Sequence, residues 1–94
     1  MQDLLKLRFQ RPASVYAETL ENKTVLMNVD ENSYYGLNQS AYWLWHKLIN
    51  GNSLEECIQL GLEYFDITDA EQLTADFSET LNEMISTKLL QQSE

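Results

Sequence analysis

The chain has 94 residues and a formal net charge of −9, with 15 acidic side chains against 6 Lys and Arg. That length suits a single domain over 1–94, and an apolar content of 44% is enough for one modest core. The first residues lack the apolar run of a signal peptide, and no later stretch is long enough to span a bilayer. We therefore expect a cytoplasmic protein that does not associate with membranes.

The charge is distributed unevenly between the two halves of the chain. Residues 1–50 carry five acidic and five basic side chains, whereas 51–94 carry ten acidic side chains and one basic residue, Lys88. Such a surface repels nucleic-acid phosphates and would steer a basic partner towards it. The alternative is a solvated face that only keeps the chain soluble.

The residue types that usually build an active site are scarce. The single cysteine, Cys57, falls on the apolar side of a predicted helix, which favours packing over a nucleophilic role. The single histidine, His46, lies off the apolar stripe of its helix, and this indicates a surface position. There is no Cys-x-x-Cys, no metal-spaced His pair and no glycine-rich phosphate loop. We expect no catalysis, no metal and no cofactor.

Two strands are predicted first, over 15–20 and 23–29, because both segments are rich in β-branched and apolar residues. Asn22 and its neighbours supply the turn that makes them a hairpin. The second segment alternates, which is typical of a sheet with one better-buried side. One face holds Val25, Met27 and Val29, and the other holds Thr24, Leu26 and Asn28.

A third, short strand is predicted over 34–37, after a turn at 30–33. Gly36 within it indicates either a close approach by another backbone or a simple bend. Upstream, Leu5, Leu7 and Phe9 alternate with polar residues, which indicates a further strand before Pro12.

Beyond residue 37 the apolar spacing changes to that of helices. Asn38 is a suitable N-cap for the first helix, which Gly51 ends, and Ser53 with Glu56 forms a capping box for the second. Thr68 with Glu71 repeats this spacing before a long third helix that runs towards Lys88. The expected apolar positions are Ala41, Leu44, Trp45, Leu48 and Ile49; Leu54, Cys57, Ile58, Gly61, Leu62 and Phe65; and Leu73, Phe77, Leu81, Met84 and Ile85.

Strands followed by helices, without alternation, favour an α+β domain: a three-stranded antiparallel sheet followed by three helices. The chain also resembles a known family. The features that carry the resemblance are Val29-Asp30 at a strand end, Tyr34-Tyr35-Gly36-Leu37-Asn38, Leu44-Trp45, the capped second helix and Leu89-Leu90. In this order they are similar to the PqqD-like family, also called precursor-peptide recognition elements.

The resemblance implies a winged-helix-like domain that binds the leader segment of a ribosomally made precursor peptide and presents it to a modifying enzyme. That enzyme would be a protease, a cyclase or a radical-based enzyme. In such proteins the leader adds as a strand beside the third strand, and the third helix forms the opposite wall. Family members often have Gly at the position of Lys88. Because this chain differs there, the resemblance does not determine the residue at which the third helix ends.

Carried over by position, the resemblance places Tyr34, Tyr35, Gly36 and Leu37 on the strand side of the peptide-binding site and one flank of the third helix on its other side. The residues that we expect to contribute from that helix are Asp76, Phe77, Thr80, Glu83 and Met84. Alternation turns Leu37 towards the core, and Lys88 is expected beside the groove. Tyr34 and Tyr35 can each contact a peptide or pack within the sheet. Trp45 lies on the apolar stripe, whereas Trp43 lies off it and can contact a partner or pack locally.

Two other functions remain as alternatives. An adaptor could dock a modifying enzyme without contacting the peptide. A winged-helix regulator that binds DNA would need clustered Lys and Arg, and the predicted helices are almost uniformly acidic. The oligomeric state, including a homodimer, stays open.

Overall fold

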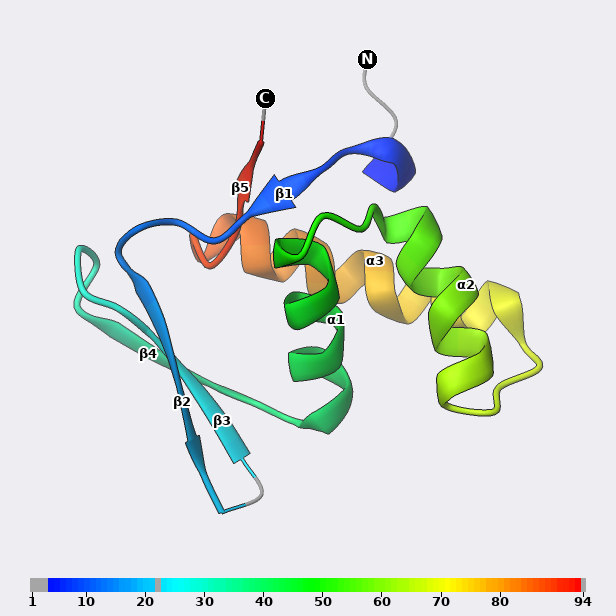
Figure 1. The fold of residues 1–94 in the computed structure, drawn as a ribbon, viewed down its shortest axis with the longest axis horizontal. Helices are drawn as coiled ribbons and strands as arrows, with labels where there is room; N and C mark the ends of the chain where they lie inside the picture. Colours follow the sequence, from blue (N-terminus) through cyan, green and yellow to red (C-terminus); the bar gives the residue numbers. More distant parts are fainter. Residues whose placement is uncertain (1–3, 22, 94) are drawn as a thin grey trace.

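The computed structural model describes residues 4–21 and 23–93; the expected turn residue Asn22 lies outside them. The predicted α+β class is confirmed (Figure 1). A short 3₁₀ helix, η1, precedes five strands and three helices in this part of the chain. They are η1 Leu4–Lys6, β1 Phe9–Gln10, β2 Val15–Leu20, β3 Lys23–Asn28, β4 Ser33–Leu37, α1 Gln39–Ile49, α2 Leu54–Tyr64, α3 Ala70–Ser86 and β5 Gln91–Gln92.

The three-stranded sheet has the order β2-β3-β4 and is antiparallel throughout. Its central strand places Leu26 opposite Ala17 on one side and Tyr35 on the other. The prediction of one better-buried face is confirmed, because Thr24, Leu26 and Asn28 are buried. Val29 lies just beyond β3 and is 60% exposed. The opposite face, which we call the outer face, carries Val25 and Met27, both half-buried.

The prediction of a further strand through Leu5, Leu7 and Phe9 was largely wrong. Leu5 belongs to η1, which packs against α2, and only Phe9 and Gln10 form a strand. This β1 pairs with β5 near the C-terminus, with Phe9 opposite Gln92. The β1–β5 pair is short because β5 contributes only two residues to it. Those residues are both glutamine, so the sequence of β5 does not predict a strand.

The helix starts follow local capping chemistry. Asn38 Oδ1 accepts a hydrogen bond from the Ala41 amide (2.8 Å), and Ser53 forms the complete capping box with Glu56. For α3 the predicted cap was one residue too early. Asp69, not Thr68, is the N-cap, with its Oδ1 accepting from the Gln72 amide at 3.0 Å. Asp is the stronger N-cap residue of the two.

All three helices end in a left-handed residue, which allows the next amides to bond back to the last turn. These residues are Gly51 (φ 100°), Asp66 (φ 53°) and Lys88 (φ 62°). After α3, the Lys88 amide donates to the Ile85 carbonyl (3.1 Å) and the Leu89 amide to the Met84 carbonyl (2.9 Å). This Schellman motif fixes the end of α3 and places Lys88 in a conformation that glycine adopts without strain.

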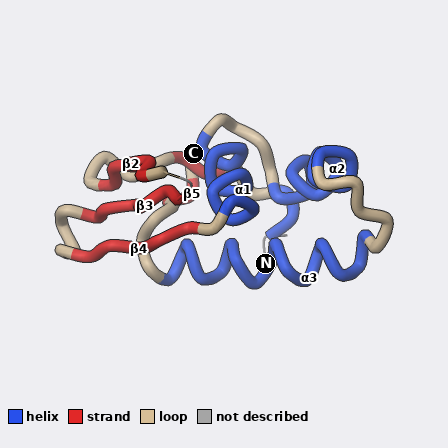
Figure 2. Tube along the Cα trace, turned by 90° about the horizontal axis from the view of Figure 1, so that it is seen from below, coloured by secondary structure: helices blue, strands red, loops and turns tan. Residues whose placement is uncertain are grey.

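The core lies between the sheet and the helices, with α1 at its centre (Figures 1 and 2). Trp45 is 2% exposed and donates its indole N–H to the Leu89 carbonyl at 3.1 Å, so its predicted core position is confirmed. Cys57 is fully buried, as expected of a packing residue. Ile85 departs from the predicted stripe and is 38% exposed, because its neighbour Met84, which is 2% exposed, takes the core-facing position in the last turn of α3.

Candidate functional site

Strand β4 forms an open edge of the sheet. In the described part of the chain it is hydrogen-bonded to β3 alone, and Figure 2 shows it as the strand on the α3 side. Between β4 and α3 lies a pocket of ≈ 390 Å³. Its walls are Tyr34, Tyr35, Gly36, Leu37, Asn38, Ala41, Thr80, Glu83, Met84, Thr87 and Leu89. A row of main-chain groups therefore faces open space beside a helix.

A second pocket of ≈ 190 Å³ continues the first one along α3. Ala41 and Thr80 line both pockets, which makes them one groove; we call it the β4–α3 groove. The second pocket is mainly apolar and is lined by Ser40, Ala41, Leu44, Phe65, Ile67, Leu73, Asp76, Phe77 and Thr80. All nine residues predicted from the sequence line one part or the other, so the structure brings the whole set together.

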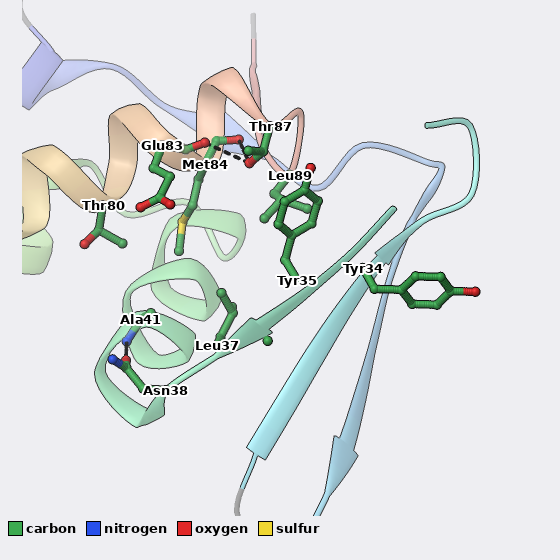
Figure 3. A pocket seen from close by; sticks show the side chains of 11 residues that line it. Tyr34, Tyr35, Leu37, Asn38, Ala41, Thr80, Glu83, Met84, Thr87 and Leu89 are labelled. Atoms are coloured by element: carbon green, nitrogen blue, oxygen red, sulfur yellow. Dashed lines mark hydrogen bonds between the residues drawn. The ribbon is translucent and has the colours of Figure 1, made fainter. Parts of the chain in front are cut away.

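The two tyrosines of β4 point in opposite directions (Figure 3). Tyr35 extends towards the end of α3 and is half-buried, whereas Tyr34 extends away from the groove and is 69% exposed. Leu37 follows the orientation of Tyr35 and is buried, as predicted. Because side chains alternate along a strand, Tyr35 and Leu37 lie on the groove side of β4, and Tyr34 and Gly36 lie on the outer face.

The α3 wall of the groove is acidic. Glu83 and Asp76 are both exposed, and they are the only charged residues among those that line the described groove. Asp76 Oδ1 accepts a hydrogen bond from Gln72 Nε2 (2.9 Å), and Glu83 forms no ion pair with a described residue. The Thr80 hydroxyl donates to the Asp76 carbonyl at 2.9 Å, which leaves its methyl group to the groove. The wall therefore offers carboxylates and apolar surface.

Lys88 does not reach the groove, contrary to expectation. Its left-handed backbone turns the chain away from α3, and its ammonium pairs with Glu31 in the β3–β4 turn (2.7 Å). This contact raises the pKa of Lys88 above its ordinary value through the hydrogen bond from Lys88 to Glu31.

Sequence reasoning missed the α1 and C-terminal contributions to the groove. Ala41 and Ser40 come from the first turn of α1, and Leu89 comes from the segment after α3. Ala41 is the one position on the predicted apolar stripe of α1 with a small side chain. This was the signal in the sequence that could have indicated a hollow beside α1. The remaining missed residues are Asn38, Leu44, Phe65, Ile67, Leu73 and Thr87.

Trp43 lies on the far side of Phe77 from the groove. Its ring stacks on Tyr64 (centroids 5.4 Å apart) and on Phe77 (6.0 Å), and it meets the edge of Phe65 at 5.2 Å. Trp43 therefore supports two aromatic walls of the apolar pocket, which is the local packing role. Tyr64, at 64% exposure, forms the solvent side of this cluster.

The described residues contain no group of His, Cys, Asp and Glu arranged to hold a metal ion. Burial raises the pKa of the Cys57 thiol to about 12, so this thiol is protonated at neutral pH. His46 is exposed and lies against the ring of Tyr42. Among the helices over 4–21 and 23–93, none combines the length and apolar character that a bilayer span requires.

The fold and groove define a winged-helix-like α+β domain with an open strand edge beside its last helix. A family model described as coenzyme PQQ synthesis protein D (PqqD) matches residues 23–90. Because this match covers more than half of the chain, the chain belongs to the PqqD family.

Two solved structures share the fold. The structure of TbiB1 in complex with the TbiA(beta) leader peptide has a TM-score of 0.78 and 20% sequence identity, and it covers 87% of this chain and 94% of that one. The lasso peptide synthetase B1 complexed with the leader peptide has a TM-score of 0.79 and 15% identity, and it covers 89% of this chain and 98% of that one. Comparison with curated proteins found no match.

Proposed function

We propose that the chain binds the leader segment of a ribosomally synthesised precursor peptide, which adds as a strand beside β4, and presents it to a modifying enzyme. The observation that carries this proposal is the unpaired edge of β4 running along the β4–α3 groove. An extended peptide gains main-chain hydrogen bonds at such an edge whatever its sequence. Membership of the PqqD family and the leader-bound state of both structural relatives support it.

Side chains of the added strand would provide specificity. Those that point into the groove meet the apolar pocket around Phe65, Leu73 and Phe77. Burying one Leu-sized side chain there stabilises the complex by roughly 1.5–3 kcal/mol. Basic side chains would pair with Glu83 and Asp76, each exposed pair contributing about 0–1 kcal/mol. Two or three buried apolar side chains, together with the main-chain hydrogen bonds to β4, give a dissociation constant in the micromolar to nanomolar range once the free-energy cost of ordering the leader is subtracted.

In this proposal the chain is a non-catalytic binding protein that works in the cytoplasm, where the precursor is made. The chemistry belongs to the partner enzyme, a protease, a cyclase or a radical-based enzyme. The protein acts by raising the local concentration of precursor at that enzyme.

The proposal is tested with fluorescently labelled synthetic peptides that tile the leader of a precursor peptide from the same genome. One peptide should bind saturably, and proline placed within its pairing segment should weaken binding by about tenfold, because proline removes a ladder donor and clashes with the partner strand. Proline outside that segment serves as the control. Equal binding of all proline variants would contradict strand addition.

A matched pair of protein variants locates the site. Thr80 borders both pockets, so Thr80→Trp should fill the groove and abolish peptide binding. Glu79→Trp adds the same ring one residue earlier, at an exposed position outside the groove, and should bind normally. If Thr80→Trp binds the leader normally, the leader binds outside the β4–α3 groove. If the wild-type chain binds no leader but retains the enzyme in a pull-down, the protein is an adaptor that does not contact the leader. Sedimentation of the protein alone would show whether a homodimer forms.

A further inference from the structure

Gly36 lies in the open strand β4 and on the outer face of the sheet. The side chain of Lys23 occupies the space that a side chain at position 36 would take. A β-carbon built on Gly36 would lie 2.5 Å from Lys23 Cε and 3.0 Å from Lys23 Nζ. The absence of a side chain at Gly36 therefore allows Lys23 to extend across β4.

The strand register explains how Lys23 reaches this point. Val25 is directly opposite Gly36, and Lys23 precedes it by two residues on the same face. Diagonal neighbours in a sheet are within reach of a long side chain. The aliphatic stem of Lys23 thus covers the bare backbone of Gly36, and its ammonium group is carried towards the free edge.

Lys23 has no ion-pair partner among residues 4–21 and 23–93. It is also the one charged residue on the outer face of β3 and β4, where its neighbours are Val25, Met27, Tyr34 and Gly36. The α3 wall of the β4–α3 groove has the charge opposite to that of Lys23, since Glu83 and Asp76 project from α3. A peptide strand added beside β4 would meet the carboxylates of α3 on its inward face and the ammonium group of Lys23 on its outward face.

We infer that Lys23 selects an acidic side chain in the bound leader, at the residue that lies opposite Gly36 and points to the outer face. The inference rests on the proposed strand addition and specifies its substrate. Cβ atoms of directly opposed residues are about 4.5–5.5 Å apart, so a carboxylate on that residue comes within ion-pair distance of Lys23 Nζ. The same carboxylate at a neighbouring, inward-facing position would be repelled by Glu83.

The test uses a displayed library of fully randomised dodecapeptides, selected against the wild-type chain and against variants. The wild type should enrich peptides with Asp or Glu at one outward position beside an inward apolar or basic residue. Lys23→Gln should remove that preference, and Lys23→Glu should replace it with Lys or Arg. For one selected peptide, the change from Asp to Asn should weaken wild-type binding by about two- to fivefold, the range of an exposed pair, and leave binding to Lys23→Gln unchanged.

Two further variants separate a local contact from general electrostatics. Lys47→Gln removes one positive charge from α1, where Lys47 lies over the ring of Trp43 rather than near β4, and it should keep the acidic preference. Gly36→Ala keeps the charge but displaces the Lys23 side chain, so it should lose the preference. Selected peptides without any Lys23-dependent acidic position would overturn this inference and leave strand addition intact. Failure to select any groove-binding peptide would count against strand addition itself.

Discussion

The side-chain amide of Asn28 donates a hydrogen bond to the main-chain carbonyl of Lys88 at 3.1 Å. Asn28 ends β3 and is 2% exposed, and its Oδ1 also accepts from the amides of Asp30 (3.1 Å) and Glu31 (3.2 Å). One buried side chain thus joins the β3–β4 turn to the residue after α3. It holds together the two walls of the β4–α3 groove at one end.

Replacing Asn28 with Ala should lower the free energy of unfolding by roughly 2–3 kcal/mol, because a buried side chain is removed and three main-chain groups lose their hydrogen-bond partner. Urea titration measures this change. Asn50→Ala is the control, since Asn50 is exposed and its bond to the His46 carbonyl can be replaced by water. A similar decrease in the free energy of unfolding for both variants would show that the burial of Asn28 does not add to the contribution of its hydrogen bonds.

Reversing the charge of Glu83 should slow association with a basic leader peptide. Glu83→Lys removes a carboxylate from the groove wall, whereas Glu79→Lys makes the same change in net charge on an exposed part of α3 outside it. Stopped-flow fluorescence at low salt should show a larger decrease in the association rate for Glu83→Lys, and added salt should reduce the difference. Equal rates for the two variants would mean that only the overall charge matters.

Glu56 should make stability depend on pH in the acidic range. Its pKa is lowered, first by the hydrogen bond from the Ser53 amide and then by the Arg8 side chain. A carboxyl whose pKa is lower in the folded state stabilises the fold above its unfolded pKa, and this contribution is lost as pH falls through the folded pKa. Glu56→Gln should therefore flatten the fall in melting temperature below about pH 4.5. Glu55→Gln, one residue earlier and outside the capping box, should leave that fall unchanged.

Cys57 should be unreactive in the folded protein. Its thiol is fully buried and its pKa is raised to about 12, mainly by desolvation. Ellman's reagent at pH 8 should react only after addition of denaturant, whereas a thiol introduced by Gln59→Cys on the exposed side of α2 should react at once. Because the thiol's pKa is higher in the folded state, its contribution to stability is complete below pH 9.0 and is lost as pH rises towards 12.

Lys88 occupies a left-handed position that glycine adopts without strain. Lys88→Gly and Lys88→Ala both remove the ion pair with Glu31, so a comparison of the two isolates the backbone contribution. Lys88→Gly should melt several degrees higher than Lys88→Ala in thermal denaturation followed by circular dichroism. A lower melting temperature for the glycine variant would mean that loss of chain entropy exceeds the relief of strain.

The sequence predicted the elements well wherever the signal is local. The caps at Asn38 and Ser53 and the strand alternation around Leu26 depend on neighbours a few residues away, and all were confirmed. The one local error was the α3 cap, which is Asp69 and not Thr68, whereas the larger error occurred where the deciding contact is remote. The Leu5–Phe9 segment was predicted as a strand, but within the described ranges 4–21 and 23–93 its only strand partner is β5, at the other end of the chain.

The same distinction applies to the groove. The sequence by itself determined the order of strands and helices, the acidic α3, and the opposite orientations of Tyr34 and Tyr35, because periodicity and capping are properties of adjacent residues. Only the tertiary structure decided that β4 is an edge strand beside α3, that Ala41 and Leu89 complete the groove, and that Lys23 crosses Gly36. These relations depend on how the buried faces of distant segments pack against one another, and spacing within one segment carries no information about that packing.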